Sequence, residues 1–339
     1  MYNKKTIAMM LTLSMLAASL AGCAGGDDDW DAENAASDVS VVWVESAWDP
    51  IIPNLNADEM CDVIISAMTK TDARDEVVDF TRAYYTSSQG VIGGSGATAI
   101  SDVSELNVAG VTVGVQSGTT SDIYANGDAT NDAMLANATV VAYEDFPTVI
   151  AALNNGDVMY ALGDAPVLSL ESDLMTSFSD ENFGFAVRED SGDLLDALNV
   201  AISAIVDSGE YDSIYAASFN GAVTLADDST ADTATAYPEP SGSSDLADVL
   251  DSGALNICTD PFYAPFESYD ADGTVVGFDA DIAHAIADEI GAHYLGAANP
   301  TFSGAALPVP DTVIRIGTLY DTTGGLSAYA AGFQTAISM

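Results

Sequence analysis

The chain has 339 residues, and its 52 Asp and Glu against 7 Lys and Arg give a formal net charge of −45 at pH 7. This surplus of carboxylates excludes nucleic-acid binding through a basic face, because contacts to phosphates require clustered Lys and Arg. A carboxylate-rich surface suits high salt, where screening removes self-repulsion, so we expect a protein adapted to a salt-rich environment.

The first residues predict export and a lipid anchor. Two lysines precede an apolar run at 6–20 that is too short to span a membrane and is followed by small residues, as in a signal peptide. The tetrapeptide Leu-Ala-Gly-Cys that ends at Cys23 has the form of a lipobox, in which the cysteine carries the lipid. A secretory signal with a chance cysteine is the alternative. We expect a lipoprotein signal peptide at 1–23 and an acidic tether at 24–38, placing the protein at the cell surface or in the periplasm.

Short apolar runs alternate with helical patterns from residue 39 onward, which predicts an α/β fold. Strands are expected at 40–45, 62–66, 77–80, 108–115, 140–142, 158–162 and 183–187. Helices are expected at 50–56, 117–124, 148–153 and 194–205, with a short one that ends at Arg74.

Arg74 is the first candidate for a ligand contact. It lies just beyond the end of the strand predicted at 62–66, and ligands of α/β sheets bind at that edge. It is also one of the few cations in the chain. A surface arginine paired to Asp72 or Asp75 is the alternative.

Several motifs occur in the order of one known family. Residues 62–85 have the form D-x-I-I-x-x-M-T-x-T-x-x-R-x-x-x-x-D-F-x-x-x-Y-Y; they follow W-D-P-I-I-P-N-L at 48–55 and precede V-G-V-Q-S-G-T-T at 113–120, D-F-P at 145–147 and L-G-D-A-P at 162–166. This series resembles the polar amino-acid solute-binding proteins of ABC transporters. The resemblance implies a two-lobed type II periplasmic-binding fold, in which each lobe is a mostly parallel sheet flanked by helices and two hinge crossings join the lobes.

The segment that opens this family's domain occurs late in the chain. After a polar linker at 221–245, L-N-I-C-T-D-P-F-Y-A-P-F at 255–266 and D-G-T-V-V-G-F-D-A-D-I-A at 272–283 resemble the domain's beginning. Either the domain is circularly permuted, or a second copy begins and stops. We predict that the late strand folds back between the strands at 40–45 and 62–66, because the buried sheet would otherwise have a gap with unpaired backbone groups.

The domain boundaries follow from this order. Lobe 1 is expected to combine 39–89, the return segment 185–220 and the permuted first strand and helix at 246–296, while lobe 2 covers 90–184. Beyond residue 297, I-R-I-G-T-L-Y-D-T-T-G-G-L resembles the truncated start of type I binding proteins for branched-chain amino acids or amides. We assign no ligand to this segment at 297–339.

The resemblance also implies contacts to one free amino acid. Arg74 would bind its carboxylate, with Thr69 and Thr120 as further donors. Asp164 would accept hydrogen bonds from the ammonium group, and Ser66 would offer a carbonyl. Closure of the lobes on the ligand would then present a shape that an ABC permease recognises; we expect a monomer.

Three further residues are expected at the ligand's side chain. Trp48 and Tyr263 would pack on its two faces, and Asp260 would face its far end. The family's motifs do not indicate which amino-acid side chain the site binds. No cofactor is expected, and no C-x-x-C or His/Cys cluster suggests a metal.

The pair Cys61 and Cys258 allows two interpretations. Both lie at the ends of or within apolar runs, and we favour two small buried side chains over a disulfide, although an exported protein permits one. Three other functions stay open: a dehydratase-like enzyme on the same fold, a ligand-sensing module, and a non-binding product of recombination.

Overall fold

The computed structural model describes residues 36–296 except 37, 58–59, 130, 220–224 and 226–233, together with the backbone of 312–315. The expected signal peptide with Cys23, most of the tether, about half of the linker and nearly all of the C-terminal segment lie outside these residues. Within the described part, none of the helices combines the length and apolar character that a membrane span requires.

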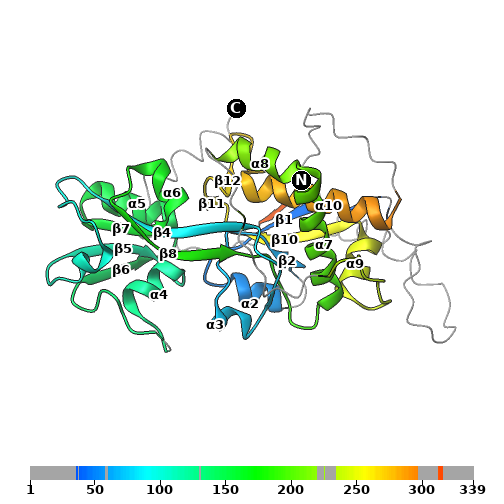
Figure 1. Ribbon diagram of the computed structural model, residues 1–339, viewed down its shortest axis with the longest axis horizontal. Helices are drawn as coiled ribbons and strands as arrows, with labels where there is room; N and C mark the ends of the chain where they lie inside the picture. Colours follow the sequence, from blue (N-terminus) through cyan, green and yellow to red (C-terminus); the bar gives the residue numbers. More distant parts are fainter. Residues whose placement is uncertain are drawn as a thin grey trace, which may run out of the picture.

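Lobe 1 is built on a six-stranded sheet with the order β14-β1-β10-β2-β9-β3. Figure 1 labels β1, β10 and β2 of this sheet. Its strands are β1 (Ser40–Glu45), β2 (Val63–Ile64), β3 (Asp79–Phe80), β9 (Ala186–Val187), β10 (Ala254–Thr259) and β14 (Thr312–Arg315). β10 is parallel to β1 over all six residues and parallel to β2 on its other side. The strand from late in the chain therefore lies in the middle of the sheet, while β9 is antiparallel to β2 and β3.

Alternating side chains of these strands fill two separate cores. Val41, Trp43 and Ile257 pack with the helices on one face, whereas Val44 and Cys258 pack on the other. Successive strand residues point to opposite faces, so a strand covered on both sides needs apolar residues throughout. That requirement explains why these runs lack a polar face.

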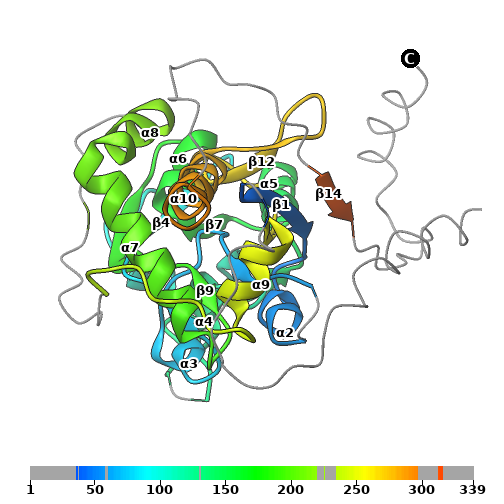
Figure 2. The same cartoon turned by 90° about the vertical axis from the view of Figure 1, so that its right-hand side faces the viewer.

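Helices cover both faces of the sheet. One side carries α7 (Gly192–Ser208), α8 (Glu210–Ser218), α9 (Asp245–Ser252) and α10 (Phe278–Tyr294); the other carries α2 (Ile51–Asn56) and α3 (Asp72–Asp75). Figure 2 shows α7, α8 and α10 side by side, and β14 next to β1 at the sheet edge. A small antiparallel sheet of β11 (Phe262–Tyr263), β12 (Glu267–Tyr269) and β13 (Val275–Val276) connects β10 to α10.

Lobe 2 contains a five-stranded sheet with the order β6-β5-β7-β4-β8. Its elements are β4 (Tyr85–Gly93), η2 (Val103–Leu106), β5 (Thr112–Gln116), α4 (Thr120–Asn126), β6 (Thr139–Tyr143), α5 (Phe146–Asn155), β7 (Tyr160–Asp164), α6 (Ala165–Glu171) and β8 (Thr176–Phe183). β5 is parallel to β6 and β7, whereas β4 is antiparallel to β7 and β8. The expected two-lobed α/β fold is confirmed, with more antiparallel pairing in lobe 2 than expected.

The chain crosses between the lobes twice, from β3 to β4 and from β8 back to β9 (Figure 1). β4 and β8 pair with each other along the crossing, and Thr69 of lobe 1 forms an isolated bridge with Phe183 at the end of β8. The hinge is therefore a two-stranded antiparallel connection.

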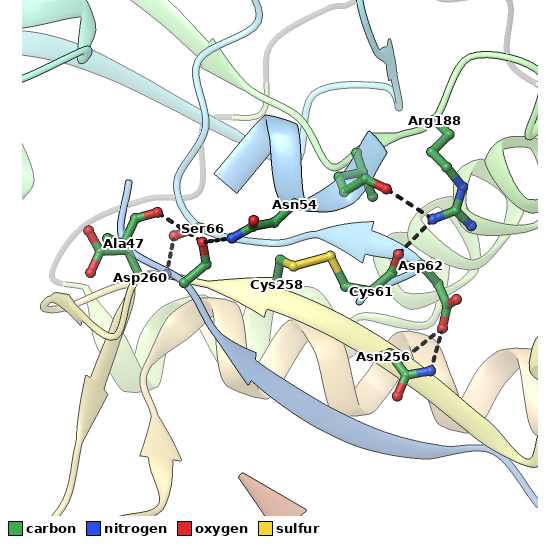
Figure 3. The surroundings of a disulfide bond; sticks show 11 residues. Ala47, Asn54, Cys61, Asp62, Ser66, Arg188, Asn256, Cys258 and Asp260 are labelled. Carbon is green, nitrogen blue, oxygen red and sulfur yellow. Dashed lines mark hydrogen bonds between the residues drawn. A yellow bond between two sulfur atoms is a disulfide. The ribbon is translucent and has the colours of Figure 1, made fainter. Parts of the chain in front are cut away.

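Cys61 and Cys258 form a disulfide, so our preference for two free buried cysteines was wrong (Figure 3). The two residues are separated by 197 positions, but the pairing of β2 with β10 brings their Cα atoms to 5.6 Å. Close by, Asn256 donates a 2.9 Å hydrogen bond to the Asp62 carboxylate. Segments far apart in sequence are therefore joined covalently within one sheet.

Candidate ligand-binding site

A cavity between the lobes, with about 340 Å³ of empty space that is partly open to solvent, brings together all eight predicted contacts. The lining residues are Trp48, Ser66, Ala67, Thr69, Arg74, Gln116, Thr119, Thr120, Asp164, Asp260, Tyr263 and Glu267. The sequence interpretation named no ligand role for Gln116, Thr119 or Glu267.

Arg74 is buried against this cavity rather than exposed. Thr71 caps the N-terminus of the short helix α3, and its side chain accepts a hydrogen bond from the backbone N–H of Arg74. The guanidinium donates to the carbonyl oxygen of Thr69 at 2.8 Å and to that of Gly118 at 3.2 Å. Burial lowers the pKa of Arg74 to about 10, while the charges of nearby carboxylates oppose this shift. The side chain stays cationic at pH 7, and the alternative of an exposed arginine is excluded.

Asp164 ends β7 on the opposite side of the cavity and is 7% exposed. Its carboxylate accepts hydrogen bonds from Gln89 Nε2 at 3.1 Å, from Ser87 Oγ at 3.2 Å and from the hydroxyl of Tyr263 in the other lobe. Burial, and then the charge of Glu181, raise the pKa of Asp164 to about 7. A cationic group would lower that pKa again, which makes Asp164 a suitable acceptor for an ammonium.

The threonine hydroxyls are already engaged by Glu181, a residue that the sequence interpretation missed. Glu181 lies in β8, is 2% exposed, and its Oε2 accepts from Thr69 Oγ1 at 2.8 Å and from Thr120 Oγ1 at 3.1 Å. A hydroxyl has one proton to donate, so neither threonine side chain has a donor left for a ligand carboxylate. In this structure, Arg74 is the charged donor that remains in the cavity. The donor roles expected for Thr69 and Thr120 toward a ligand stay predictions.

Asp260 and Ser66 meet at the far end of the cavity. The Asp260 backbone N–H donates to Ser66 Oγ at 3.0 Å (Figure 3). The Asp260 carboxylate accepts from Gln116 Nε2 of lobe 2 at 3.2 Å. Burial raises the pKa of Asp260 to about 7. Ser66 thus uses its side chain to hold the loop that carries Asp260.

Two more buried acids, Glu267 and Asp279, accept hydrogen bonds at this end of the cavity. Ser66 Oγ donates to Glu267 Oε1 at 2.7 Å, and the backbone N–H of Ala67 donates to Asp279 Oδ2 at 2.7 Å. Ala67 has a φ of 44°, a left-handed conformation that this hydrogen bond helps to hold. Burial, then the charge of Asp279, raise the pKa of Glu267 well above its usual value. Asp279 lies in the motif at 272–283 and Glu267 directly follows the motif at 255–266, but no spacing reveals that the two acids meet.

The two aromatic residues line the cavity in different ways. The Trp48 ring centre lies 5.1 Å from Arg74 Cζ, so the indole packs on the guanidinium. The Tyr263 ring contacts Phe146 edge-on at a centroid distance of 5.2 Å, and its hydroxyl binds Asp164. Among the described residues there is no group of three or more His, Cys, Asp or Glu arranged to hold a metal ion.

This cavity belongs to a protein of a known class. Residues 28–221 and 255–302 match the model of the bacterial extracellular solute-binding proteins, family 3, and the chain belongs to that family. It is 29% identical to a probable histidine-binding protein of Neisseria gonorrhoeae over 56% of this chain and 74% of the relative. It is 30% identical to an L-arginine-binding protein of Pseudomonas aeruginosa over 52% of this chain and 71% of the relative.

The solved structures similar to this chain include an ancestral arginine-binding protein bound to arginine. It is 28% identical, has a TM-score of 0.47, and is matched over 52% of this chain and 78% of its own. The resemblance expected from the sequence is confirmed: the chain is a solute-binding protein, and its named relatives bind amino acids.

Proposed function

We propose that the protein is a receptor that binds one free amino acid between its lobes and delivers it to an ABC importer. The observation that carries the proposal is the placement of Arg74 and Asp164, two buried groups of opposite charge, on one cavity. A free amino acid carries a carboxylate and an ammonium in one molecule, so it can pair with both groups and offset the cost of their burial.

The two lobes already touch across the cavity. Tyr263 of lobe 1 binds Asp164 of lobe 2, and Gln116 of lobe 2 binds Asp260 of lobe 1. A ligand that contacts both lobes would stabilise the closed form through interactions that the open form lacks. The closed shape is what an importer would recognise, and a lipid on Cys23 would keep the receptor at the membrane.

We further propose that 246–296 is the family's opening segment, moved by circular permutation. The central position of β10 supports this proposal. The new chain break falls between α10 and β1, at the strands' amino-terminal edge. Since the cavity lies at the carboxyl-terminal edge, the break leaves the site intact.

An enzyme on the same fold is the second candidate, because buried acids with pKa values near 7 also suit proton transfer. The experiment is a thermal-shift screen of the twenty amino acids, with mass spectrometry of the compounds afterwards. A receptor is stabilised by about 2.7 kcal/mol at a ligand concentration of about 100 Kd and returns the ligand unchanged. Turnover of the ligand would favour the enzyme, and stabilisation by none of the twenty would contradict the receptor.

A further inference from the structure

A buried carboxylate lies behind the wall of the cavity, at the end where Arg74 is found. Glu181 in β8 is 2% exposed, yet it is not among the residues that line the cavity. It therefore takes no space from a ligand. Any effect of Glu181 on binding has to act through hydrogen bonds and through charge.

Three hydrogen-bond donors converge on one oxygen of Glu181. Its Oε2 accepts from Thr69 Oγ1 at 2.8 Å and from Thr120 Oγ1 at 3.1 Å. The same oxygen accepts from Gln89 Nε2 at 3.1 Å. Both threonines line the cavity, one from each lobe. Because a hydroxyl has one proton, both side chains direct that proton to Glu181 and present only lone pairs to a ligand.

Glu181 also acts on Arg74 through its charge. Burial lowers the pKa of Arg74, and the charge of Glu181 opposes this shift more strongly than the charge of Asp164 does. The guanidinium donates to the carbonyl oxygen of Thr69, whose hydroxyl donates to Glu181, so one residue connects the two charges. A ligand carboxylate on Arg74 would share this cation with a buried anion and would be repelled by that anion.

We propose that Glu181 competes with the carboxylate of the ligand: it holds the hydroxyl protons of Thr69 and Thr120 and offsets the charge of Arg74. This inference rests on the proposed receptor function. Glu181 then weakens the binding of every free amino acid, whatever its side chain. Affinity differences between related complexes lie mostly in the dissociation rate, so the weaker contact speeds release. Faster release suits a receptor that passes its ligand on.

The first test is Glu181→Gln, measured by titration calorimetry with the twenty amino acids. Glutamine removes the charge, and its amide can donate to one threonine oxygen, which frees that hydroxyl proton for a ligand. The amino acid that binds most tightly should bind at least about tenfold more tightly than to the native protein, the ratio expected from one charge-assisted hydrogen bond. Unchanged or weaker binding would overturn the competition.

The matched control is Asp180→Asn, which makes the same change of charge at the exposed neighbouring residue of β8. It should bind as the native protein does, and a gain equal to that of Glu181→Gln would overturn the proposal in favour of general electrostatics. If Glu181→Gln does not fold, Glu181→Asp is measured instead, because the shorter side chain withdraws the carboxylate from both threonines. Binding no tighter than native by that variant would overturn the proposal.

The second test repeats the titrations with the α-amide of the same amino acid, which keeps the ammonium and the side chain but lacks the negative charge. The four affinities form a cycle that isolates the interaction between the Glu181 charge and the ligand carboxylate. Glu181→Gln should gain affinity for the free amino acid and none for the α-amide. An equal gain for both would indicate a changed cavity shape and overturn the competition.

The same titrations separate this proposal from the receptor function. A native protein that binds an amino acid, with no gain in Glu181→Gln, would overturn the competition and leave the receptor function intact. Binding of none of the twenty by either protein would overturn both.

Discussion

Arg74 and Asp164 are a basic and an acidic residue that folding buries on the same cavity. Among the described residues no ion pair joins them. Arg74 keeps its proton at neutral pH despite a lowered pKa. Its guanidinium donates hydrogen bonds to two carbonyl oxygens, which carry no formal negative charge. An anionic ligand group is the natural complement.

The variant Arg74→Ala should therefore lose amino-acid binding while remaining folded. Removing one half of a buried charge pair costs about 3–5 kcal/mol, which is more than about a hundredfold in affinity. Calorimetry measures the affinity and circular dichroism the fold. Arg82→Ala, which removes a cation that contacts Ser203 away from the cavity, is the control. Normal binding by Arg74→Ala would show that the carboxylate contact is elsewhere.

Asp164→Asn should weaken binding at least about tenfold, since the ammonium then loses a charge-assisted hydrogen bond. Asp157→Asn has the same change of charge on the exposed turn before β7 and should bind as the native protein does. Equal effects of the two variants would point to the general acidity of the chain instead of a specific contact.

The pH dependence follows from Asp260, whose pKa rises from 3.8 to about 7 on burial. The folded protein holds this proton more tightly than the unfolded chain, so the acid's contribution makes the empty protein less stable as pH rises from about 4 to 7. Asp260→Asn should flatten this stability profile, measured by urea unfolding at several pH values; an unchanged profile would contradict the role of Asp260.

At the scale of single elements, the sequence predicts strands with apolar runs well and polar strands poorly. β1 has the predicted bounds, because its alternating residues pack on two cores. β4 and β8 contain Ser, Thr, Asp and Glu, and the sequence does not predict them as strands. They form because they pair with each other at the hinge, and such tertiary pairing overrides local propensity.

The same limit applies to the site. Motifs in the family's order identified the eight cavity residues, but Glu181 and Glu267 gain their importance from burial next to groups more than 60 positions away. The disulfide was also open at the sequence level, because two cysteines 197 residues apart do not specify a pair.

The disulfide should stabilise the protein by about 2–5 kcal/mol, because it closes a long loop in the unfolded chain. Urea unfolding with and without reductant measures this difference. The double variant Cys61→Ser, Cys258→Ser should show the lower stability and no response to reductant. Equal stability of the oxidised and reduced native protein would mean that the pairing of β10 with β1 and β2 holds these segments together without a contribution from the disulfide.

At the scale of the whole molecule, the net charge of −45 opposes folding at low ionic strength. Most of the acids in the described part of the chain are exposed or half-buried, and salt screens their repulsion within about 3 Å at 1 M. The melting temperature should therefore rise from low salt to molar NaCl, as differential scanning calorimetry can measure. Highest stability without salt would contradict this adaptation.

Calorimetric titration of the native protein with the amino acid that gives the largest thermal shift tests the receptor function most directly. We predict saturable binding of one amino acid per chain, because the cavity offers a single Arg74–Asp164 pair among the described residues. Absence of saturable heat with all twenty amino acids would contradict it.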